Sequence, residues 1–330
     1  METVSATALA GGARRMGKTG FVVSRLGYGG MELAGAPLAR DLSEQQAIKF
    51  INRVIDAGIN YIDTSIDYGL SERLIGKVME HRRADVVLAT KCGCQVGVEG
   101  VERHHGESHT FTGENIMAGI EQSLRRLRTD HLDVVQVHGR PTRKQLEDGG
   151  VIEAMLEAKK QGKVRQLGIS SRLPTLEDYI DVDYFSVVQV PYSALQRHNE
   201  DAIAALRRSG KAVVCRGVTG RGAPAKNWAT RPIGTADGEA RDIWEKAKLD
   251  ELLDGMSPIE FMIRFVLANE NVDVALVATT DEAHLLADID YAANGALEAE
   301  RLEKAKRRLT AAGSMPGAGK YRGGGPTPVL

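Results

Sequence analysis

The chain of 330 residues is long enough for one large barrel, since α/β barrels reach about 250 residues or more as a single unit. A content of 42% hydrophobic and 26% charged residues is that of a globular protein with a sizeable core. The net charge of −1 argues against nucleic-acid binding, which requires a basic face. With no apolar run near the ~20 residues of a membrane helix and no signal-peptide pattern, we expect a cytoplasmic protein without membrane contact.

Eight short apolar runs are spaced along the chain and predict eight β-strands. Several of them, such as DVVLAT and LDVVQV, are apolar on consecutive residues, which is typical of parallel strands buried on both faces. In chain order the runs are residues 25–28, 59–62, 86–90, 132–137, 164–169, 185–190, 212–215 and 272–277.

Helical patterns fill the intervals between these runs. Ser43 and Gln46 have the spacing of a capping box, and Gly58 closes the amphipathic segment that follows them. Gly162 is placed to end another helix. Residues 257–260, Ser-Pro-Ile-Glu, predict a second capping box with proline at the first helical position.

Alternation of strands and helices predicts a parallel sheet with right-handed crossovers, and eight units favour a closed (β/α)8 barrel. The alternative is an open doubly wound sheet, but its G-x-G-x-x-G phosphate motif is missing, since Gly27, Gly29 and Gly30 have a different spacing. We therefore predict an α/β protein with one TIM-barrel domain over residues 1–330, of which residues 313–330 form an irregular tail.

Ionisable residues stand just after three of the apolar runs, where a barrel of this kind gathers its catalytic groups. Asp63 follows the second run, Lys91 the third and His138 the fourth, and Tyr68 lies in the loop after Asp63. Singly, each is more often a helix cap, a solvated charge or a packing residue. Together they form a chemically coherent group.

This group suits proton delivery to a carbonyl that is being reduced. A phenol with a pKa of about 10 is a poor acid at neutral pH, and a neighbouring ammonium lowers that pKa. We expect Lys91 to act on Tyr68 in this way, Asp63 to hold Lys91 charged, and His138 to hydrogen-bond the carbonyl oxygen or help move the proton.

The sequence resembles the aldo-keto reductase family over nearly its whole length, from RMGKTGFVVSRLGYGG to about residue 290. DAGINYIDTSIDYGLSERLIGKVM is similar to the family signature, and VVLATKCG and SLRRLRTDHLDVVQVHGRP resemble the strands that carry its lysine and histidine. GKVRQLGIS and VVQVPYSALQR resemble two further family segments. The resemblance implies a catalytic tetrad of Asp63, Tyr68, Lys91 and His138 and the reduction of an aldehyde, ketone or sugar carbonyl.

The resemblance also implies a nicotinamide cofactor that lies extended across the barrel mouth. Ser170 and Gln189 would bind its carboxamide, residues 216–222 its pyrophosphate, and a helix N-terminus after residue 280 its adenosine end. The implied cofactor-binding residues are Gly30, Met31, Asp63, Ser170, Ser171, Gln189, Arg216, Gly217, Val218, Gly220, Arg221, Gly222, Thr279, Thr280, His284 and Asp288.

Some positions depart from the family pattern. Ser171 stands in place of the usual asparagine, Arg216 in place of an aromatic residue, and His284 in place of a frequent arginine, so the basic clamp for a 2′-phosphate is thin. We expect NADPH rather than NADH. The alternatives are a redox-neutral sugar-modifying enzyme with tightly bound NAD(P) and a non-catalytic cofactor-sensing subunit. The expected partner is a small molecule, and a homo-oligomer is compatible with the sequence.

Two groups of possible metal ligands are present. Cys92 and Cys94 form a CxC pair, and three cysteines in all give no disulfide framework. His104, His105 and His109 are close in sequence, in the loop after the third predicted strand. We interpret the histidines as part of a solvated polar loop and expect no metal.

Overall fold

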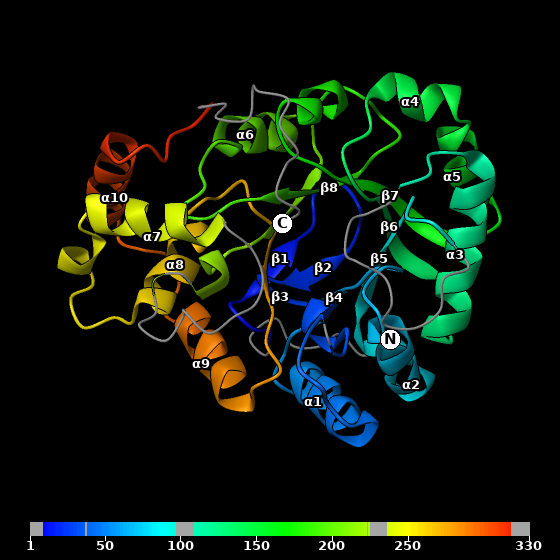
Figure 1. Ribbon diagram of the computed structural model, residues 1–330, viewed down its shortest axis with the longest axis horizontal. Coiled ribbons are helices and arrows are strands. Elements are labelled where there is room, and N and C mark those ends of the chain that lie inside the picture. Colours follow the sequence, from blue (N-terminus) through cyan, green and yellow to red (C-terminus); the bar gives the residue numbers. More distant parts are fainter. Residues whose placement is uncertain (1–8, 37, 97–108, 223, 225–235, 318–330) are drawn as a thin grey trace.

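The computed structural model describes residues 9–36, 38–96, 109–222, 224 and 236–317. Eight parallel strands close into a barrel in the order β10-β3-β4-β5-β6-β7-β8-β9, which confirms the predicted (β/α)8 fold (Figure 1). The strands are β3 (Leu26–Gly29), β4 (Tyr61–Asp63), β5 (Val87–Cys92), β6 (Leu132–Val137), β7 (Val164–Ser170), β8 (Val187–Pro191), β9 (Ala212–Arg216) and β10 (Val274–Val277). Each overlaps one predicted run.

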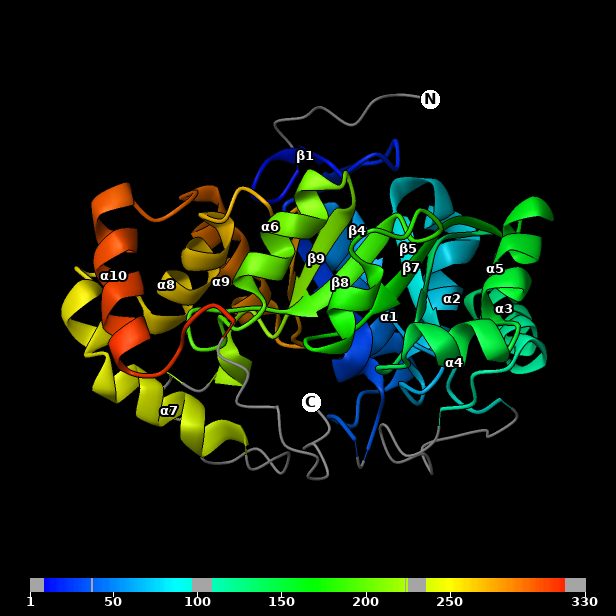
Figure 2. The same cartoon turned by 90° about the horizontal axis from the view of Figure 1, so that it is seen from above.

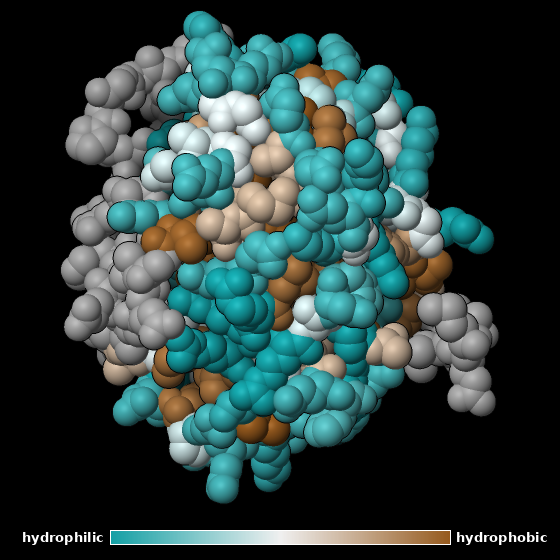
Figure 3. Space-filling view, turned by 90° about the vertical axis from the view of Figure 1, so that its right-hand side faces the viewer, coloured by the Kyte–Doolittle hydropathy of each residue, from teal (hydrophilic) through white to brown (hydrophobic). Residues whose placement is uncertain are grey.

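Helices surround the barrel, with apolar faces against the strands and, on the side seen in Figure 3, a largely hydrophilic outer surface. The α-helices are α1 (Glu44–Asp56), α2 (Ser71–Arg82), α3 (Gly113–Leu127), α4 (Arg143–Asp148), α5 (Val151–Lys160), α6 (Glu200–Arg208), α7 (Ala236–Lys246), α8 (Pro258–Leu267), α9 (Glu282–Ala293) and α10 (Ala299–Ala311). Short 3-10 helices are η2 (Gly30–Leu33), η3 (Arg83–Asp85), η4 (Thr175–Tyr179), η5 (Gly220–Gly222) and η7 (Leu249–Leu252). Within these described ranges, no helix is both long and apolar enough to cross a membrane.

The predicted helix ends are confirmed with one exception. Ser43 and Gln46 form the full capping box of α1, and Gly162 follows α5 with a φ of 76°. Ser257 caps α8 by accepting a hydrogen bond from the Glu260 backbone N–H. The Glu260 carboxylate, however, accepts from side chains elsewhere, Arg264 at 3.1 Å and Asn294 at 3.0 Å. The second capping box is therefore only half formed.

Some elements of the structure were not predicted, and two differences concern the barrel directly. An antiparallel hairpin, β1 (Ala13–Arg15) and β2 (Val22–Ser24), precedes the barrel, and Figure 2 shows β1 at one end of the molecule with α4 and α7 toward the other. Met16 and Val23 of this segment pack into the apolar cluster inside the barrel. The connection from β7 to β8 contains the 3-10 helix η4 where the alternation predicted an α-helix.

The apolar core has two parts, which follow from the alternation of side chains along a strand. The larger part lies between the strands and the surrounding helices. The smaller part fills the barrel interior and includes Tyr61, Ala89, Val134 and Val187. The interior of the barrel is thus packed, as is usual for this fold, and chemistry is left to its C-terminal end.

Candidate functional site

The inward-facing positions of the strands change from apolar to polar toward the C-terminal end of the barrel. Residues two apart on a strand share a face. On β4 the interior residue Tyr61 is followed on that face by Asp63, and on β5 Ala89 is followed by Lys91. The same change occurs on β6, from Val134 to Gln136, and on β8, from Val187 to Gln189. A layer of buried polar side chains therefore lies directly on the apolar interior.

Asp63 is the acceptor at the centre of this layer. Its Oδ2 accepts a hydrogen bond from Lys91 Nζ at 2.5 Å, and its Oδ1 accepts from Nε2 of Gln136 and of Gln189, both at 2.9 Å. Lys91 Nζ also donates to the Thr64 carbonyl at 2.9 Å. The buried carboxylate thus has an opposite charge and three donors, which offset the cost of removing it from water.

The four predicted catalytic residues lie at the same end of the barrel, but two of them lie within strands rather than after them. Asp63 is the last residue of β4 and Lys91 lies within β5, whereas the sequence placed both just after strands. His138 directly follows β6, and Tyr68 lies between β4 and α2. The strands extend further because the inward polar residues find partners on neighbouring strands.

Tyr68 packs against the lysine of this layer. Lys91 Nζ lies 4.8 Å from the centroid of the Tyr68 ring. Burial raises the pKa of the Tyr68 phenol above its usual 10, while the charges of Lys91 and Arg216 act in the lowering direction. The charge of Lys91 therefore acts on the Tyr68 pKa in the predicted direction. The predicted net decrease of that pKa is wrong, because burial raises it by more than the nearby charges lower it. Burial also lowers the pKa of Lys91, and Asp63 and Tyr68 raise it by more, so the net shift is upward and the ammonium stays charged.

His138 is held beside Tyr68 by contacts on its backbone and its ring. Its backbone N–H donates to the Cys92 carbonyl at 2.8 Å, and the two rings meet edge-on with centroids 6.3 Å apart. His138 Nδ1 lies 3.2 Å from Cys94 Sγ and 3.4 Å from Asp67 Oδ2. Nδ1 is thus directed to these two side chains.

Comparison with known proteins agrees with this fold. The model of the Aldo/keto reductase family matches residues 25–307. The chain belongs to this family. It is an NAD(P)H-dependent oxidoreductase that acts on carbonyl compounds.

Individual relatives are distant. The chain is 29% identical to the uncharacterized oxidoreductase YqkF of Bacillus subtilis over 214 residues, which cover 63% of this chain and 65% of YqkF. It is 26% identical to the aldo-keto reductase YhdN of the same organism over 283 residues, covering 78% and 82%. Among solved structures, the holo form of aldo-keto reductase AKR11C1 from Bacillus halodurans has a TM-score of 0.75 at 28% identity, covering 90% of this chain and 95% of that one.

The residues expected to bind the nicotinamide end of the cofactor lie around the polar layer of the reductase. Ser170 Oγ donates to Gln189 Oε1 at 3.1 Å, and both side chains are buried. Ser171 is turned away toward Thr175, with 3.3 Å between the two hydroxyl oxygens. Gly30 packs so closely that a Cβ there would lie 2.7 Å from Ser71 Oγ. Its neighbour Met31 is half-buried.

The segment expected at the pyrophosphate follows β9 of the reductase. Gly217, Gly220 and Gly222 all have positive φ values, of 70°, 58° and 83°. The N–H groups of Gly220 and Gly222 donate to carbonyls within this segment, those of Gly217 and Thr219. Val218 is buried, and the side chain of Arg221 lies outside what the structure describes.

Positive charge at the start of this segment comes from Arg216, which is half-buried. Burial and the charges of Arg172 and Arg216 lower the pKa of the buried His198 to about 4. The β7–β9 side of the mouth is therefore electropositive at neutral pH, because both arginines keep their charge while His198 is neutral.

The predicted adenosine end differs from expectation at the start of α9. Asp281 caps this helix, and its Oδ1 accepts from the backbone N–H groups of Ala283 at 2.9 Å and His284 at 3.2 Å. The expected phosphate site at this helix N-terminus is thus already held by a carboxylate, as a helix end favours. His284 is exposed and Thr280 half-buried, whereas Thr279 is buried with its side chain accepting from the Asp281 N–H. Burial raises the pKa of Asp288 to about 7.

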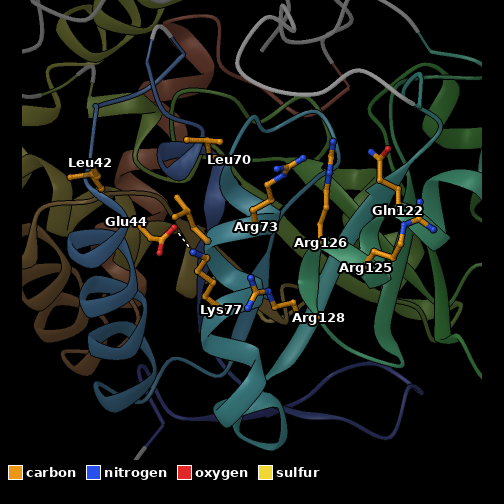
Figure 4. Close-up of a pocket in the computed structure, with 10 residues that line it drawn as sticks. Leu42, Glu44, Leu70, Arg73, Lys77, Gln122, Arg125, Arg126 and Arg128 are labelled. Atoms are coloured by element: carbon orange, nitrogen blue, oxygen red, sulfur yellow. Dashed lines mark ion pairs between the residues drawn. The ribbon is translucent and has the colours of Figure 1, made fainter.

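A groove on the outside of the barrel, between α1, α2 and α3, is a separate feature (Figure 4). Arginine and lysine side chains line much of it, and most of them are in ion pairs: Lys77 with Glu44, Arg126 with Glu72, and Arg128 with Glu80. These pairs join neighbouring helices. The groove is therefore a seam of the helical layer rather than a part of the site at the strand ends.

Sequence reasoning missed several residues of the site. Gln136 is a polar residue at an inward position of an apolar strand, and that position was the available signal. Asp67 and Cys94 contact His138 but lie in loops, where no periodicity marks them. His109 was interpreted as part of a solvated loop, yet it is half-buried against His138, with ring centroids 5.3 Å apart. His104 and His105 lie outside the described residues.

Proposed function

We propose that this reductase converts an aldehyde, ketone or sugar carbonyl to an alcohol, with Tyr68 as the proton donor. The observation that carries the proposal is the buried chain of contacts from Asp63 to Lys91 at 2.5 Å and from Lys91 Nζ to the Tyr68 ring at 4.8 Å. It joins a fixed charge to a phenol at the end of the barrel where catalytic groups gather.

The residues at the mouth fit a nicotinamide cofactor. Ser170 and Gln189 are buried and offer the donors and acceptors that a carboxamide requires, and Arg216 and Arg172 provide positive charge for a pyrophosphate. When bound, the cofactor supplies the hydride. Gly30 lets its chain segment pack closely on α2 beside Asp63, since a Cβ there would lie only 2.7 Å from Ser71 Oγ and 3.2 Å from the Asp63 carbonyl.

Side chains of the protein supply the proton and stabilise the negative charge that develops during reduction. Because its pKa is raised, Tyr68 is fully protonated at neutral pH and has a proton to give. Lys91 stabilises the phenolate that remains after transfer, and Asp63 keeps Lys91 in place. His138, oriented through Nδ1 by Cys94 and Asp67, is placed to donate to the carbonyl oxygen as it gains negative charge.

The role of Tyr68 is tested with Tyr68→Phe, which removes the hydroxyl and little else. General acid catalysis contributes about 10²–10⁴-fold, so we expect kcat/KM for carbonyl reduction to fall by at least about 100-fold. The cofactor Kd, from fluorescence titration, should stay within about threefold, since the hydroxyl contributes to chemistry rather than to cofactor binding.

Tyr184→Phe is the matched control, because this half-buried tyrosine precedes β8 at the opposite end of the barrel. It should retain wild-type kinetics. Turnover by Tyr68→Phe at more than a tenth of the wild-type rate would remove Tyr68 as the donor.

One observation favours NADPH as the cofactor, and another favours NADH. The family resemblance favours NADPH, whereas the Asp281 carboxylate at the start of α9 disfavours a 2′-phosphate there. We propose NADPH and test it by the ratio of the two Kd values. A ratio of ten or more in favour of NADPH supports the proposal, and a preference for NADH overturns it. Asp281→Asn should shift the ratio toward NADPH in either case.

A further inference from the structure

Three side chains with metal-ligand chemistry converge at the edge of the proposed active site. Cys94, His109 and His138 each offer one ligand atom, and the three atoms all lie within 4.8 Å of one another. The closest pair, Cys94 Sγ and His138 Nδ1, is 3.2 Å apart. Thiolate and imidazole on a tetrahedral zinc ion stand about 3.5 Å from each other, so small rotations bring this set into range.

The backbone fixes the three residues relative to one another. Cys94 and His109 form an antiparallel β-bridge, and next to it the Thr110 N–H donates to the Gly93 carbonyl at 2.8 Å. The His138 N–H donates to the Cys92 carbonyl at 2.8 Å, which ties the third ligand to the same strand end. The convergence therefore rests on main-chain hydrogen bonds rather than on side-chain conformations alone.

Neighbouring residues also shape the position of His109. Phe111 stacks on its ring, with centroids 5.8 Å apart and an interplanar angle of 13°. Gly139, at a φ of 96°, lets the ring approach the chain after His138, since a Cβ there would lie 3.2 Å from His109 Nε2. Asn115 donates to the Cys94 carbonyl at 3.1 Å and holds the other side of the bridge. The imidazole is thus packed toward the thiol rather than left in solvent.

We propose that Cys94, His109 and His138 form a binding site for a thiophilic divalent cation such as Zn²⁺. A thiol and two imidazoles are a ligand set that zinc prefers, with a water or the nearby Asp67 carboxylate in the fourth position. Binding displaces the thiol proton of Cys94 to solvent and forms the metal–sulfur bond. His138 and His109 are partly exposed, so the site opens toward the barrel mouth.

Occupancy of this site inhibits the enzyme, a consequence that rests on the proposed role of His138. The cation takes Nδ1 of His138, the atom that now contacts Cys94 and Asp67. Nδ1 is then bound to the metal and cannot carry a proton, so the ring cannot become an imidazolium as the carbonyl oxygen gains negative charge. The site thereby couples metal availability to carbonyl reduction.

Metal binding is tested without turnover, by titrating the purified full-length protein with Co²⁺ as a spectroscopic substitute for Zn²⁺. We expect one equivalent to bind, with a sulfur-to-cobalt charge-transfer absorption in the near ultraviolet. Cys94→Ser should abolish this absorption, and His109→Gln should weaken binding at least about tenfold, the scale of losing support at a metal site. Circular dichroism and cofactor binding confirm that each variant folds.

Cys215→Ala is the matched thiol control, because Cys215 is buried on β9 away from these ligands. It should keep the absorption. Absence of the band in the wild type, or its persistence in Cys94→Ser, overturns the site.

Inhibition is measured separately. Zn²⁺ should lower turnover of the wild type, and Cys94→Ser should need at least ten times more Zn²⁺ for the same relative loss. A cobalt band without inhibition overturns the regulatory role. Tyr68→Phe should bind Co²⁺ as the wild type does, so failure of the proposed proton donor and failure of the metal site give different results.

Discussion

At the scale of single residues, Lys91 is the side chain on which the proposed chemistry depends most. It is fully buried, yet it keeps its charge because Asp63 lies 2.5 Å away. Its charge in turn limits how far burial raises the pKa of Tyr68. The Asp63–Lys91 ion pair therefore offsets part of the increase in the Tyr68 pKa that burial causes.

Lys91→Met should slow carbonyl reduction by about 100-fold or more, the lower end of general acid catalysis, at every pH. Without the ammonium, burial raises the pKa of Tyr68 further and leaves it a weaker acid. In the wild type the rate of reduction should not fall below pH 10, since burial raises the pKa of the Tyr68 phenol above its usual 10 and the donor form is the protonated phenol. Steady-state kinetics from pH 6 to 10.5 check both statements. Lys211→Met, another buried lysine, should keep the wild-type pH profile.

Asp288 gives a residue-scale prediction about stability. Its pKa is about 7 in the folded protein and about 3.9 in an unfolded chain, so ionisation opposes folding and stability is lost as pH rises between these values. Asp288→Asn removes that loss. Its stabilising effect should be about 2–3 kcal/mol larger at pH 8 than at pH 5, measured by urea unfolding without cofactor. Asp290→Asn, an exposed neighbour on α9, should show no such pH dependence.

At the scale of elements, α2 and α3 approach each other through a glycine. A Cβ at Gly76 of α2 would lie 2.1 Å from the Arg126 carbonyl oxygen and 2.9 Å from Leu127 Cα. Main-chain atoms cannot move aside cheaply, so Gly76→Ala must separate the two helices.

Gly76→Ala should cost about 2–3 kcal/mol of unfolding free energy, as overpacking does. Gly119→Ala, in α3, is the matched control, because its Cβ would meet only ordinary contacts, the nearest Ile66 Cδ1 and Val96 Cγ2 at 3.6 Å. That change should stabilise the protein by about 0.5–1 kcal/mol through helix propensity. Equal effects of the two substitutions in chemical denaturation would contradict the close packing.

The elements also show what the sequence could and could not predict. The eight barrel strands were predictable because parallel strands buried on both faces are apolar at consecutive positions. The β1–β2 hairpin was not, since each strand has three residues and too few positions for a period. Asp63 and Lys91 were identifiable from their place at strand ends. The contact of Cys94 with His109 depends on a bridge between segments 15 residues apart, and no local pattern encodes it.

At the scale of the whole molecule, Arg197 joins the C-terminal part of the chain to the barrel mouth. It is buried, and its Nη1 donates to the carbonyls of Lys306 at 3.1 Å and Ser314 at 3.2 Å, while its Nε pairs with Glu200 at 2.6 Å. Residues 313–317 thus pack on the loop after β8. The predicted tail beyond them, 318–330, lies outside the described residues.

Arg197→Met should destabilise the protein by about 2–3 kcal/mol, because the buried carbonyl acceptors lose their donor, while the Glu200 carboxylate keeps Lys306 as a partner at 2.9 Å. Calorimetry should show a lower Tm. Arg143→Met, which breaks an exposed pair with Glu147, should change stability by less than about 1 kcal/mol. A loss of the same size in both variants would show that Arg197 is not the anchor.

The hairpin before the barrel determines from which end a small molecule can reach the site. Met16 and Val23 pack against the side chains that fill the barrel interior. A molecule that reaches Asp63 therefore arrives and departs on one side of the protein.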